Sequence, residues 1–333
     1  MTTTTGKTAI IGGGSWATAL AKLINDKDVE LNWWIYEKEI SDHISQYSHN
    51  PQYLSSVEFQ IDFLRISNDI QHIIDKSDTL VFCVPAAFLH SVCRNIRPGS
   101  LNGKIIVSTI KGVVPEYHQI PADYFADVLL VRPDCYVVAS GPSHAEEVAR
   151  EKLTYLTIAS QNPELTDLVA GLFSGRFLRT ITCNDVHGIE YATVLKNIYA
   201  IAAGICKGLG YGDNFIAVLI SNCHQEMHEF LSTIGQNHRK ISRSAYLGDL
   251  IVTAYSQHSR NRNLGTMIGS GYSVASARLE MRMIAEGYYA ARSINEITRS
   301  RDISLPICHA VYQILYENAD ASRSIRELSK IFK

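Results

Sequence analysis

The first half of the chain alternates short, nearly continuous apolar runs with stretches whose apolar positions recur at helical spacing. Such runs, bounded by glycine, proline or charged residues, are typical of strands buried on both faces of a parallel sheet. They predict strands at residues 7–11, 31–36, 78–84, 104–110, 136–140 and 155–160. Helices are predicted at residues 16–24 and 144–150. Strands that alternate with helices indicate an α/β domain with a mainly parallel, doubly wound sheet.

The second half has a different pattern. After about Asp185 the strand-like runs fade, and long helical patterns follow, interrupted by glycine at residues 208–212 and 269–271. A chain of 333 residues is long enough for two domains with separate cores. We therefore predict a doubly wound domain over residues 1–187 and an all-helical domain over residues 188–333.

Composition and charge restrict the partners of the protein. The formal net charge is −2 and lysine and arginine are spread along the chain, so neither a nucleic-acid surface nor a polybasic membrane anchor is expected. The polar start lacks a signal-peptide core, and no apolar run has the length of a membrane span. Seven cysteines without a Cys-x-x-Cys pair favour free thiols in the cytoplasm and indicate no metal site. A homodimer is compatible with these properties.

A glycine-rich turn follows the first predicted strand and leads into the first predicted helix. It reads Gly-Gly-Gly-Ser-Trp-Ala over residues 12–17, which fits the dinucleotide-binding fingerprint with Ala17 in its third position. Gly12 would permit the tight turn, and Gly14 would let the backbone approach a pyrophosphate. The helix N-terminus would then present free N–H groups to the phosphates. The sequence therefore predicts a Rossmann-type domain that binds a dinucleotide.

An acidic residue stands at the end of the second predicted strand, about 20 residues beyond the glycine turn. A carboxylate here, at Glu37, would accept a hydrogen bond from the adenosine 2′-hydroxyl and would repel a 2′-phosphate. The preceding residue is Tyr36, and no arginine stands beside it. This favours NAD over NADP, although NADP stays possible. In the alternative interpretation, Glu37 is a solvated residue of a Glu-Lys-Glu turn.

A lone lysine lies in the middle of the most apolar helical pattern. Between Glu190 and Lys207 the only charged residue is Lys196. Burying an unpaired ammonium group is costly, so a lysine in this position needs a reason. Lys196 could be a catalytic lysine whose pKa is lowered by burial. It could instead be a structural lysine that reaches the surface or pairs with Glu190.

Four further stretches carry polar residues suited to a ligand: residues 109–112, 140–143, 247–250 and 259–262. Lys111 and the Ser-Gly-Pro-Ser stretch each follow a predicted strand, at the edge where open α/β sheets bind ligands. Asp249 stands in an apolar setting. Arg260 and Arg262 offer guanidinium groups suited to a phosphate. Taken singly, these residues could also be a surface lysine, a helix cap and a solvated arginine face.

Seven short motifs occur in one order along the chain: Gly-Gly-Gly-Ser-Trp-Ala-Thr-Ala-Leu, Ile-Lys-Gly, Ser-Gly-Pro-Ser, Leu-Lys-Asn, Gly-Asp-Leu, Ser-Arg-Asn-Arg and Ala-Glu-Gly. In this combination the chain resembles the NAD(P)-dependent glycerol-3-phosphate dehydrogenases of the bacterial soluble type, from about residue 7 to about residue 320. The resemblance implies hydride transfer between C2 of sn-glycerol 3-phosphate and nicotinamide C4, giving dihydroxyacetone phosphate. Glycerol 3-phosphate is a precursor for glycerophospholipid synthesis.

The resemblance also implies roles for individual residues. Lys196 would be the proton acceptor, Lys111 would lie beside substrate and nicotinamide, and Asp249 would contact the substrate hydroxyls. Other substrate contacts are implied at Gly141, Ser143, Ser259, Arg260 and Asn261, with the last three holding the phosphate. Cofactor contacts are implied at Ser15, Trp16, Lys111, Ala145, Arg260, Ile284 and Glu286. The nicotinamide would lie between the domains, with the helical domain as a substrate lid. A lysine whose pKa is brought toward neutrality by burial and a second cation can both accept and return the hydroxyl proton.

The chain departs from the pattern of these dehydrogenases at four places. The third fingerprint glycine is Ala17, and Tyr36 stands where many bacterial members have an arginine. Tyr246 replaces a usual glycine, and residues 214–216 read Asn-Phe-Ile in place of Asn-Thr-Arg. Two alternatives remain. Another Rossmann-type hydroxyacid dehydrogenase is disfavoured by Ser-Arg-Asn-Arg together with Gly-Asp-Leu, and a non-catalytic NAD-binding protein by the retained lysines and aspartate.

Overall fold

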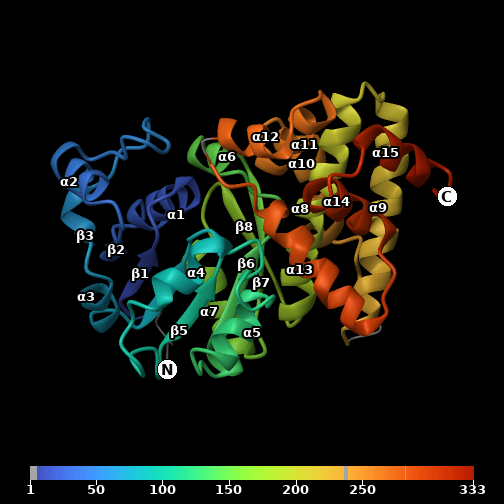
Figure 1. Cartoon of the computed structure of the whole chain (residues 1–333). Coiled ribbons are helices and arrows are strands. Elements are labelled where there is room, and N and C mark those ends of the chain that lie inside the picture. Colours follow the sequence, from blue (N-terminus) through green and yellow to red (C-terminus); the bar gives the residue numbers. More distant parts are fainter. Residues whose placement is uncertain (1–5, 236–238, 282) are drawn as a thin grey trace. The chain divides into compact units, whose positions relative to one another are not determined.

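The computed structural model describes residues 6–235, 239–281 and 283–333. These residues form two compact units (Figure 1). The first unit comprises the chain up to Ile110 together with Pro121–Val186, and the second comprises Lys111–Ile120 together with His187–Lys333. The segment Lys111–Ile120 thus belongs with the helical part of the chain, whereas the sequence prediction included it in the sheet domain.

An eight-stranded sheet forms the centre of the first unit, in the order β3-β2-β1-β4-β5-β6-β7-β8. Its strands are β1 (Thr8–Ile11), β2 (Leu31–Trp34), β3 (Leu64–Ser67), β4 (Thr79–Phe82), β5 (Ile105–Ser108), β6 (Tyr136–Ser140), β7 (Thr154–Ala159) and β8 (Leu178–Cys183). All neighbouring strands are parallel except β6 and β7. The strand order reverses between β1 and β4, which is where open sheets of this kind bind ligands at the carboxyl ends of their strands.

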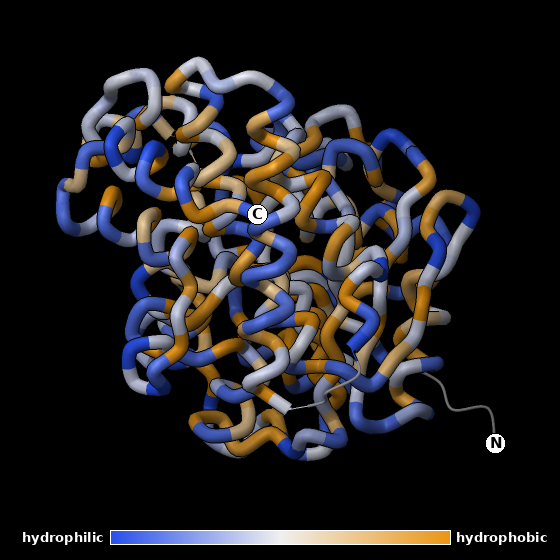
Figure 2. Tube along the Cα trace, turned by 90° about the vertical axis from the view of Figure 1, so that its right-hand side faces the viewer, coloured by the Kyte–Doolittle hydropathy of each residue, from blue (hydrophilic) through white to orange (hydrophobic). Residues whose placement is uncertain are grey.

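Helices connect these strands and bury the sheet. They are α1 (Ser15–Asn25), α2 (Lys38–Tyr47), α3 (Ile70–Asp75), α4 (Ala86–Cys93), α5 (Pro121–Asp127), α6 (Ala145–Ala149) and α7 (Pro163–Phe173). β1, β2 and β4 are buried at every position, as expected from their nearly continuous apolar runs. In Figure 2 many of the outer turns are hydrophilic, whereas hydrophobic stretches gather inside. The predicted doubly wound, mainly parallel sheet is confirmed.

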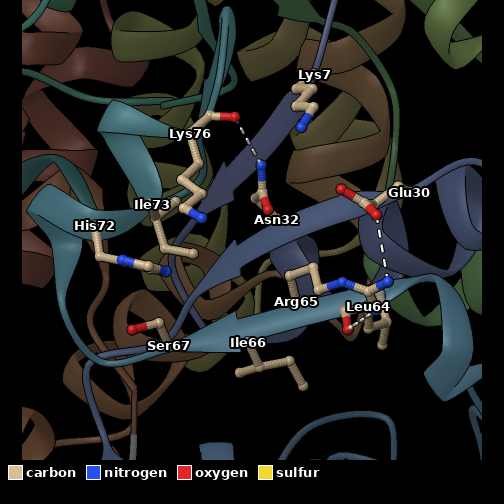
Figure 3. Close-up of a pocket in the computed structure, with 10 residues that line it drawn as sticks. All are labelled: Lys7, Glu30, Asn32, Leu64, Arg65, Ile66, Ser67, His72, Ile73 and Lys76. Carbon is tan, nitrogen blue, oxygen red and sulfur yellow. Dashed lines mark hydrogen bonds and ion pairs between the residues drawn. The ribbon is translucent and has the colours of Figure 1, made fainter.

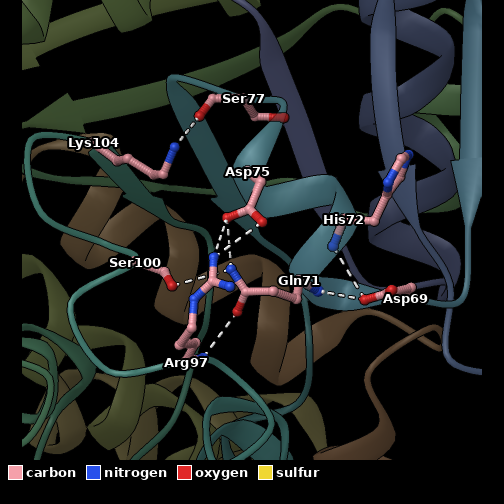
Figure 4. Close-up of polar contacts among 8 residues, drawn as sticks. All are labelled: Asp69, Gln71, His72, Asp75, Ser77, Arg97, Ser100 and Lys104. Atoms are coloured by element: carbon pink, nitrogen blue, oxygen red, sulfur yellow. Dashed lines mark hydrogen bonds and ion pairs between the residues drawn. The ribbon is translucent and has the colours of Figure 1, made fainter.

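The two strands at the edges of the sheet, β3 and β8, were not predicted from the sequence. β3 and β8 mix apolar with polar residues and are only partly buried, so they lack a continuous apolar run. The short helix α3 beside β3 buries three isoleucines, and polar contacts hold it as well (Figure 4). The Asp69 carboxylate caps it by accepting the N–H groups of Gln71 and His72, and Arg97 pairs with Asp75 at 3.0 Å.

The second unit is helical, as predicted, and no helix among the described residues is both long and apolar enough to cross a bilayer. Its helices are α8 (Val186–Gly208), α9 (Asp213–Thr233), α10 (Asp249–Tyr255), α11 (Arg260–Gly269), α12 (Val274–Glu280), α13 (Glu286–Arg301), α14 (Pro306–Tyr316) and α15 (Ala321–Ser329). A π-helical turn, Ser244–Gly248, precedes α10.

A buried carboxylate joins two of these helices. Glu226 of α9 is 4% exposed, and its two carboxylate oxygens accept the N–H groups of Ile307 and Cys308 at 2.7 and 3.0 Å. These N–H groups belong to the first turn of α14, where a helix has no acceptors of its own. Glu226 therefore caps α14 from a neighbouring helix, although burial raises the pKa of its carboxyl group to about 7.

Candidate active site

Three charged residues meet in the second unit. The Nζ atom of Lys196, in the middle of α8, lies 2.6 Å from Asp249 Oδ1, at the start of α10. The Nζ atom of Lys111 lies 3.6 Å from Asp249 Oδ2. The side chains of Lys196 and Asp249 are 5% and 1% exposed, and that of Lys111 is 21% exposed. Lysine and aspartate residues from three distant parts of the sequence thus form one buried charge cluster, which we call the lysine–aspartate cluster.

The burial of Lys196 follows from its helix. All residues of α8 from 188 to 206 are buried, so this helix has no face that would let a lysine reach solvent. A buried ammonium group requires a partner, and Asp249 provides it. Lys196 therefore does not reach the surface, which was one of its two structural interpretations. The other was an ion pair with Glu190, whereas the ion pair in the structure is with Asp249.

The cluster shifts the acidity of Lys196. Burial lowers the pKa of the Lys196 ammonium group to about 7, with Asp249 opposing this shift and the positive charge of Lys111 adding to it. A group with a pKa near neutrality is populated in both protonation states at neutral pH. Lys196 can therefore both accept and donate a proton, as reversible oxidation of an alcohol requires.

Asp249 is held by its own helix, and among the described residues its Oδ2 atom has only the longer ion-pair contact with Lys111. Thr253 Oγ1 donates to the backbone carbonyl of Asp249 at 2.6 Å, one turn further along α10. Asp249 Oδ2 accepts no hydrogen bond from any described residue, although it is buried. A buried acceptor without a donor is costly for the folded state. Asp249 Oδ2 is thus available to a hydroxyl group of a ligand.

Two polar residues that the sequence analysis did not select support the cluster. The Asn197 side chain donates to the backbone carbonyl of Lys111 at 2.7 Å, and Asn197 is 4% exposed. Thr253 is the second, through its bond to Asp249. The signal was present in the sequence, because Asn197 adjoins Lys196 in an apolar pattern and Thr253 lies four residues after Asp249.

The predicted phosphate-binding residues stand at the start of α11. Ser259 caps this helix by accepting the N–H of Arg262, and Asn261 Oδ1 accepts the N–H of Gly287 at 2.8 Å. Gly287 in turn packs against the backbone of α8, where an added Cβ would lie 2.5 Å from the Asn197 carbonyl oxygen. Asn261 and the start of α13 therefore lie beside the part of α8 that carries the lysine–aspartate cluster.

Other predicted residues of the second unit lie at the same end of α13. Ile284 precedes α13, and Glu286 is its first residue. Two departures from the family pattern are packing residues instead. Phe215 stacks on Tyr211 with ring centroids 4.4 Å apart, and Tyr246 is buried in the π-helical turn. Tyr246 thus fills space in the core of the second unit, whereas Phe215 packs in a partly exposed aromatic contact.

The glycine loop has the form that the fingerprint predicts. Gly12 has φ +130°, a backbone conformation that favours glycine, and Ala17 is fully buried. A Cβ added at Gly14 would meet no atom within 4 Å, so this position leaves room for a ligand. Helix α1 begins at Ser15 without a side-chain cap, which leaves its first N–H groups open to an anion. These features fit a dinucleotide pyrophosphate.

Glu37 and the loop lie close together. A Cβ added at Gly13 would be 3.7 Å from Glu37 Oε2, so the carboxylate lies beside the loop backbone. Tyr36 is 75% exposed. In the first turn of α1, Trp16 has a buried indole N–H without a partner among the described residues. The loop region thus presents a carboxylate, an aromatic ring and free N–H groups together.

The second predicted loop of the first unit shares this edge of the sheet. Gly141 follows β6 as Gly12 follows β1, and the strands from β1 through β4 and β5 to β6 are parallel. Ser143 Oγ donates to the Gly141 carbonyl at 3.0 Å. Ala145 begins α6, which packs against α1. Gly141, Ser143 and Ala145 therefore belong to the same side of the first unit as the glycine loop.

A groove of about 420 Å³ lies elsewhere in the first unit (Figure 3). Its polar lining includes Lys7, Glu30, Asn32, Arg65, His72 and Lys76. The charged residues are exposed, and Arg65 pairs with Glu30 at 3.3 Å. Lys7 precedes β1 whereas Gly12 follows it, so this groove is separate from the glycine loop.

A dinucleotide-binding sheet domain joined to a helical unit with a buried lysine–aspartate pair defines an NAD(P)-linked dehydrogenase. Residues 7–166 match the family model described as NAD-dependent glycerol-3-phosphate dehydrogenase N-terminus, and residues 185–326 match the model of its C-terminus. The chain belongs to the NAD(P)-dependent glycerol-3-phosphate dehydrogenases; it is an oxidoreductase with NAD(P) as its coenzyme.

Individual relatives agree with this family over the full length. The chain is 34% identical to glycerol-3-phosphate dehydrogenase [NAD(P)+] of Chlorobium limicola, over 96% of both proteins. Identity to that of Chlorobium chlorochromatii is 36%, again over 96% of both. The crystal structure of glycerol-3-phosphate dehydrogenase from Coxiella burnetii matches with a TM-score of 0.89 and 29% identity, over 97% of this chain and 98% of that chain. The two alternatives considered from the sequence are thereby set aside.

Proposed function

We propose that Lys196 is the acid–base group of the dehydrogenase reaction at C2 of the substrate. The observation that carries this proposal is the buried pair of Lys196 and Asp249, 2.6 Å apart, in which the lysine has a pKa of about 7. An exposed lysine would stay protonated at neutral pH and could not act as a base. The position of Lys196 in α8 is therefore suited to proton transfer at physiological pH.

In the reductive direction, the Lys196 ammonium group donates its proton to the ketone oxygen of dihydroxyacetone phosphate as that oxygen gains charge. In the oxidative direction, neutral Lys196 accepts the proton of the C2 hydroxyl group. When bound, the nicotinamide supplies or accepts the hydride. Lys111 stabilises negative charge on the C2 oxygen, and Asp249 Oδ2 accepts a hydrogen bond from a substrate hydroxyl. Asn197 keeps Lys111 in place by donating its side-chain amide to the Lys111 backbone carbonyl.

The substrate phosphate binds at the start of α11. Arg260 provides the charge, and the first N–H groups of α11 add donors at the positive end of the helix. The side-chain oxygen of Asn261 already accepts the N–H of Gly287, so the side-chain NH₂ group of Asn261 is left as a donor. Ser259 completes this group of residues. Gly141 and Ser143 contribute further substrate contacts, as in the resemblance described above.

The first unit provides most of the dinucleotide contacts, and the second provides the acid–base and phosphate-binding residues. Gly12, Gly14, Ser15 and Trp16 contact the pyrophosphate, while Glu37 accepts from the adenosine ribose. Because the Glu37 carboxylate lies beside the loop, the enzyme prefers NAD to NADP. Ala145, Lys111, Arg260, Ile284 and Glu286 make the remaining cofactor contacts.

The proposed setting is the cytoplasm. All seven cysteines are free, and burial raises the pKa of the Cys83, Cys93 and Cys206 thiols to about 12, so they are poor nucleophiles. Glycerol 3-phosphate made there is available for glycerophospholipid synthesis. A homodimer stays a prediction that sedimentation can measure.

The substitution Lys196→Met tests the proposal. The variant should lose kcat by about 10²- to 10⁴-fold, the usual contribution of a general acid–base group, while its Kd for NADH stays unchanged. Lys207→Met is the matched control, because Lys207 is an exposed lysine in the last turn of the same helix, α8. A folded Lys196→Met protein with near-normal kcat would remove Lys196 from the mechanism.

A further inference from the structure

Three buried side chains hold the carbonyl oxygens of the glycine loop. Trp33 Nε1 donates to the Gly12 carbonyl at 2.7 Å. Asn50 Nδ2 donates to the Gly13 carbonyl at 3.1 Å, and Thr18 Oγ1 donates to the Gly14 carbonyl at 3.0 Å. Each of the three donor residues is 0% exposed. Three successive peptide groups are thus fixed from the protein interior, and we call Trp33, Asn50 and Thr18 the carbonyl clamp.

The three donors form one connected network. Asn50 Nδ2 also donates to Thr18 Oγ1 at 3.0 Å, so these two side chains support each other. The Asn50 carbonyl oxygen accepts the N–H groups of Gln52 and Tyr53, which fixes the orientation of its amide. Every polar atom of the Asn50 side chain is therefore engaged, and its donors cannot turn away without leaving a buried group unpaired.

Fixing a carbonyl also fixes the next N–H group. In a trans peptide the C=O and the following N–H point in opposite directions. Carbonyls held toward the interior therefore turn the N–H groups of Gly13, Gly14 and Ser15 to the other side. Within the described residues, these three N–H groups donate to no protein acceptor. They are the successive backbone donors that an anion-binding loop needs.

Three consecutive glycines make such fixing necessary. Glycine has the lowest cost of rotating its backbone, so a Gly-Gly-Gly segment samples many orientations when nothing holds it. A rotated peptide would present a carbonyl oxygen to the pyrophosphate, which repels it. A loop already held in the binding orientation loses less conformational entropy when the ligand binds.

We propose that Trp33, Asn50 and Thr18 are positioning residues for cofactor binding, which preorganise the N–H groups of the glycine loop toward the dinucleotide pyrophosphate. The inference rests on the proposed role of this loop. None of the three was selected from the sequence, where Trp33 reads as a strand residue and Thr18 as a helix residue. Asn50 lies beyond α2, 36 positions after Gly14 in the chain.

The test compares variants that remove one clamp donor each. In Thr18→Val the hydroxyl is lost without a change in shape, whereas Thr18→Ser keeps it. Trp33→Phe removes the indole N–H. The matched control is Trp34→Phe, because the neighbouring Trp34 donates its indole N–H at 2.9 Å to the Asn68 carbonyl, outside the glycine loop. Calorimetry measures Kd for NADH and for ADP-ribose, and thermal unfolding measures the stability of each variant.

We expect Thr18→Val and Trp33→Phe to raise Kd for both ligands by about three- to tenfold, the effect of one lost hydrogen bond. Thr18→Ser and Trp34→Phe should bind like the wild type. KM for NADH should rise in the clamp variants, with kcat at saturating NADH unchanged. Equal affinity in all variants would overturn the clamp, as would an equal loss in Trp34→Phe, since that loss would reflect general stability. A wild type that fails to bind ADP-ribose would instead overturn the proposed role of the loop.

Discussion

Replacing Asp249 with asparagine should move the pH dependence of catalysis to lower pH. The carboxylate lies 2.6 Å from Lys196 Nζ, and both side chains are almost completely buried. Its negative charge stabilises the protonated lysine against burial and against the positive charge of Lys111, which both lower the pKa. Without that charge the pKa of Lys196 should fall below its wild-type value of about 7.

The size of the shift follows from the contact that is lost. A charge-assisted hydrogen bond contributes about 1.5–3 kcal/mol, and one pKa unit corresponds to about 1.4 kcal/mol. The midpoint should therefore fall by about one to two pH units. Alcohol oxidation needs neutral Lys196, so its rate rises with pH through the midpoint. Ketone reduction needs the ammonium form, so its rate falls above the midpoint.

The assay follows NADH absorbance in both directions between about pH 5 and pH 9 at constant ionic strength. The measured quantity is kcat at saturating substrates, because it reports groups of the enzyme–substrate complex and not the ionisation of the free phosphate substrate. Asp213→Asn is the control, since Asp213 is an exposed aspartate of the same unit. An unchanged or higher midpoint in Asp249→Asn would show that Lys196 is not the titrating group.

Three further outcomes follow from the structure. Arg260→Ala should raise KM for dihydroxyacetone phosphate by roughly 10- to 100-fold, because a charge-assisted contact with the phosphate is lost. Arg262→Ala should change KM little. Steady-state kinetics measures both variants, and equal effects would contradict the role of Arg260. Glu37→Gln should reduce the ratio of kcat/KM for NADH to kcat/KM for NADPH. The ratio is measured at fixed ionic strength, because salt screens the repulsion between the Glu37 carboxylate and the 2′-phosphate. An unchanged ratio means that the carboxylate does not face the ribose. Glu226→Ala should lower the free energy of unfolding in urea by about 3 kcal/mol or more, because two buried N–H groups lose their acceptor. The control Glu229→Ala, on the exposed side of α9, should have almost no effect.

Much of the fold could be predicted from local sequence patterns. The strands buried on both faces were found because their apolar runs are nearly continuous, as in β1 and β4, and the glycine turn after β1 marked the first helix. The edge strand β8 was missed because its sequence, Leu-Arg-Thr-Ile-Thr-Cys, interrupts apolar with polar residues and is partly exposed. Sheet edges have only one neighbouring strand, so their sequences carry a weaker apolar signal.

The site could be predicted only in part, for a different reason. Lys196 was conspicuous because a charge in an apolar helix violates the local pattern. Its partner was not predictable from that pattern, since Glu190, six residues before it, and Asp249, more than fifty residues after it, were both chemically suitable. The choice depends on how α8 and α10 pack, which only the tertiary structure determines. Asn197 and Thr253 stand at conspicuous positions, beside Lys196 and one helix turn after Asp249, but their hydrogen bonds go to backbone carbonyls, which the residue types alone do not specify.

The segment Lys111–Ile120 has a consequence for how the protein is made. The ribosome synthesises it before any of the helices α8 to α15, yet its contacts are with them, through Asn197 and through a 3.0 Å hydrogen bond between His118 and Ser293. A truncation after residue 187 would therefore not yield a self-contained sheet domain, because these ten residues would be synthesised without their packing partners. Cutting the gene at the apparent domain boundary would separate Lys111 from Lys196 and Asp249. Co-expression of the two pieces should recover activity only to the extent that the first piece inserts this segment into the second.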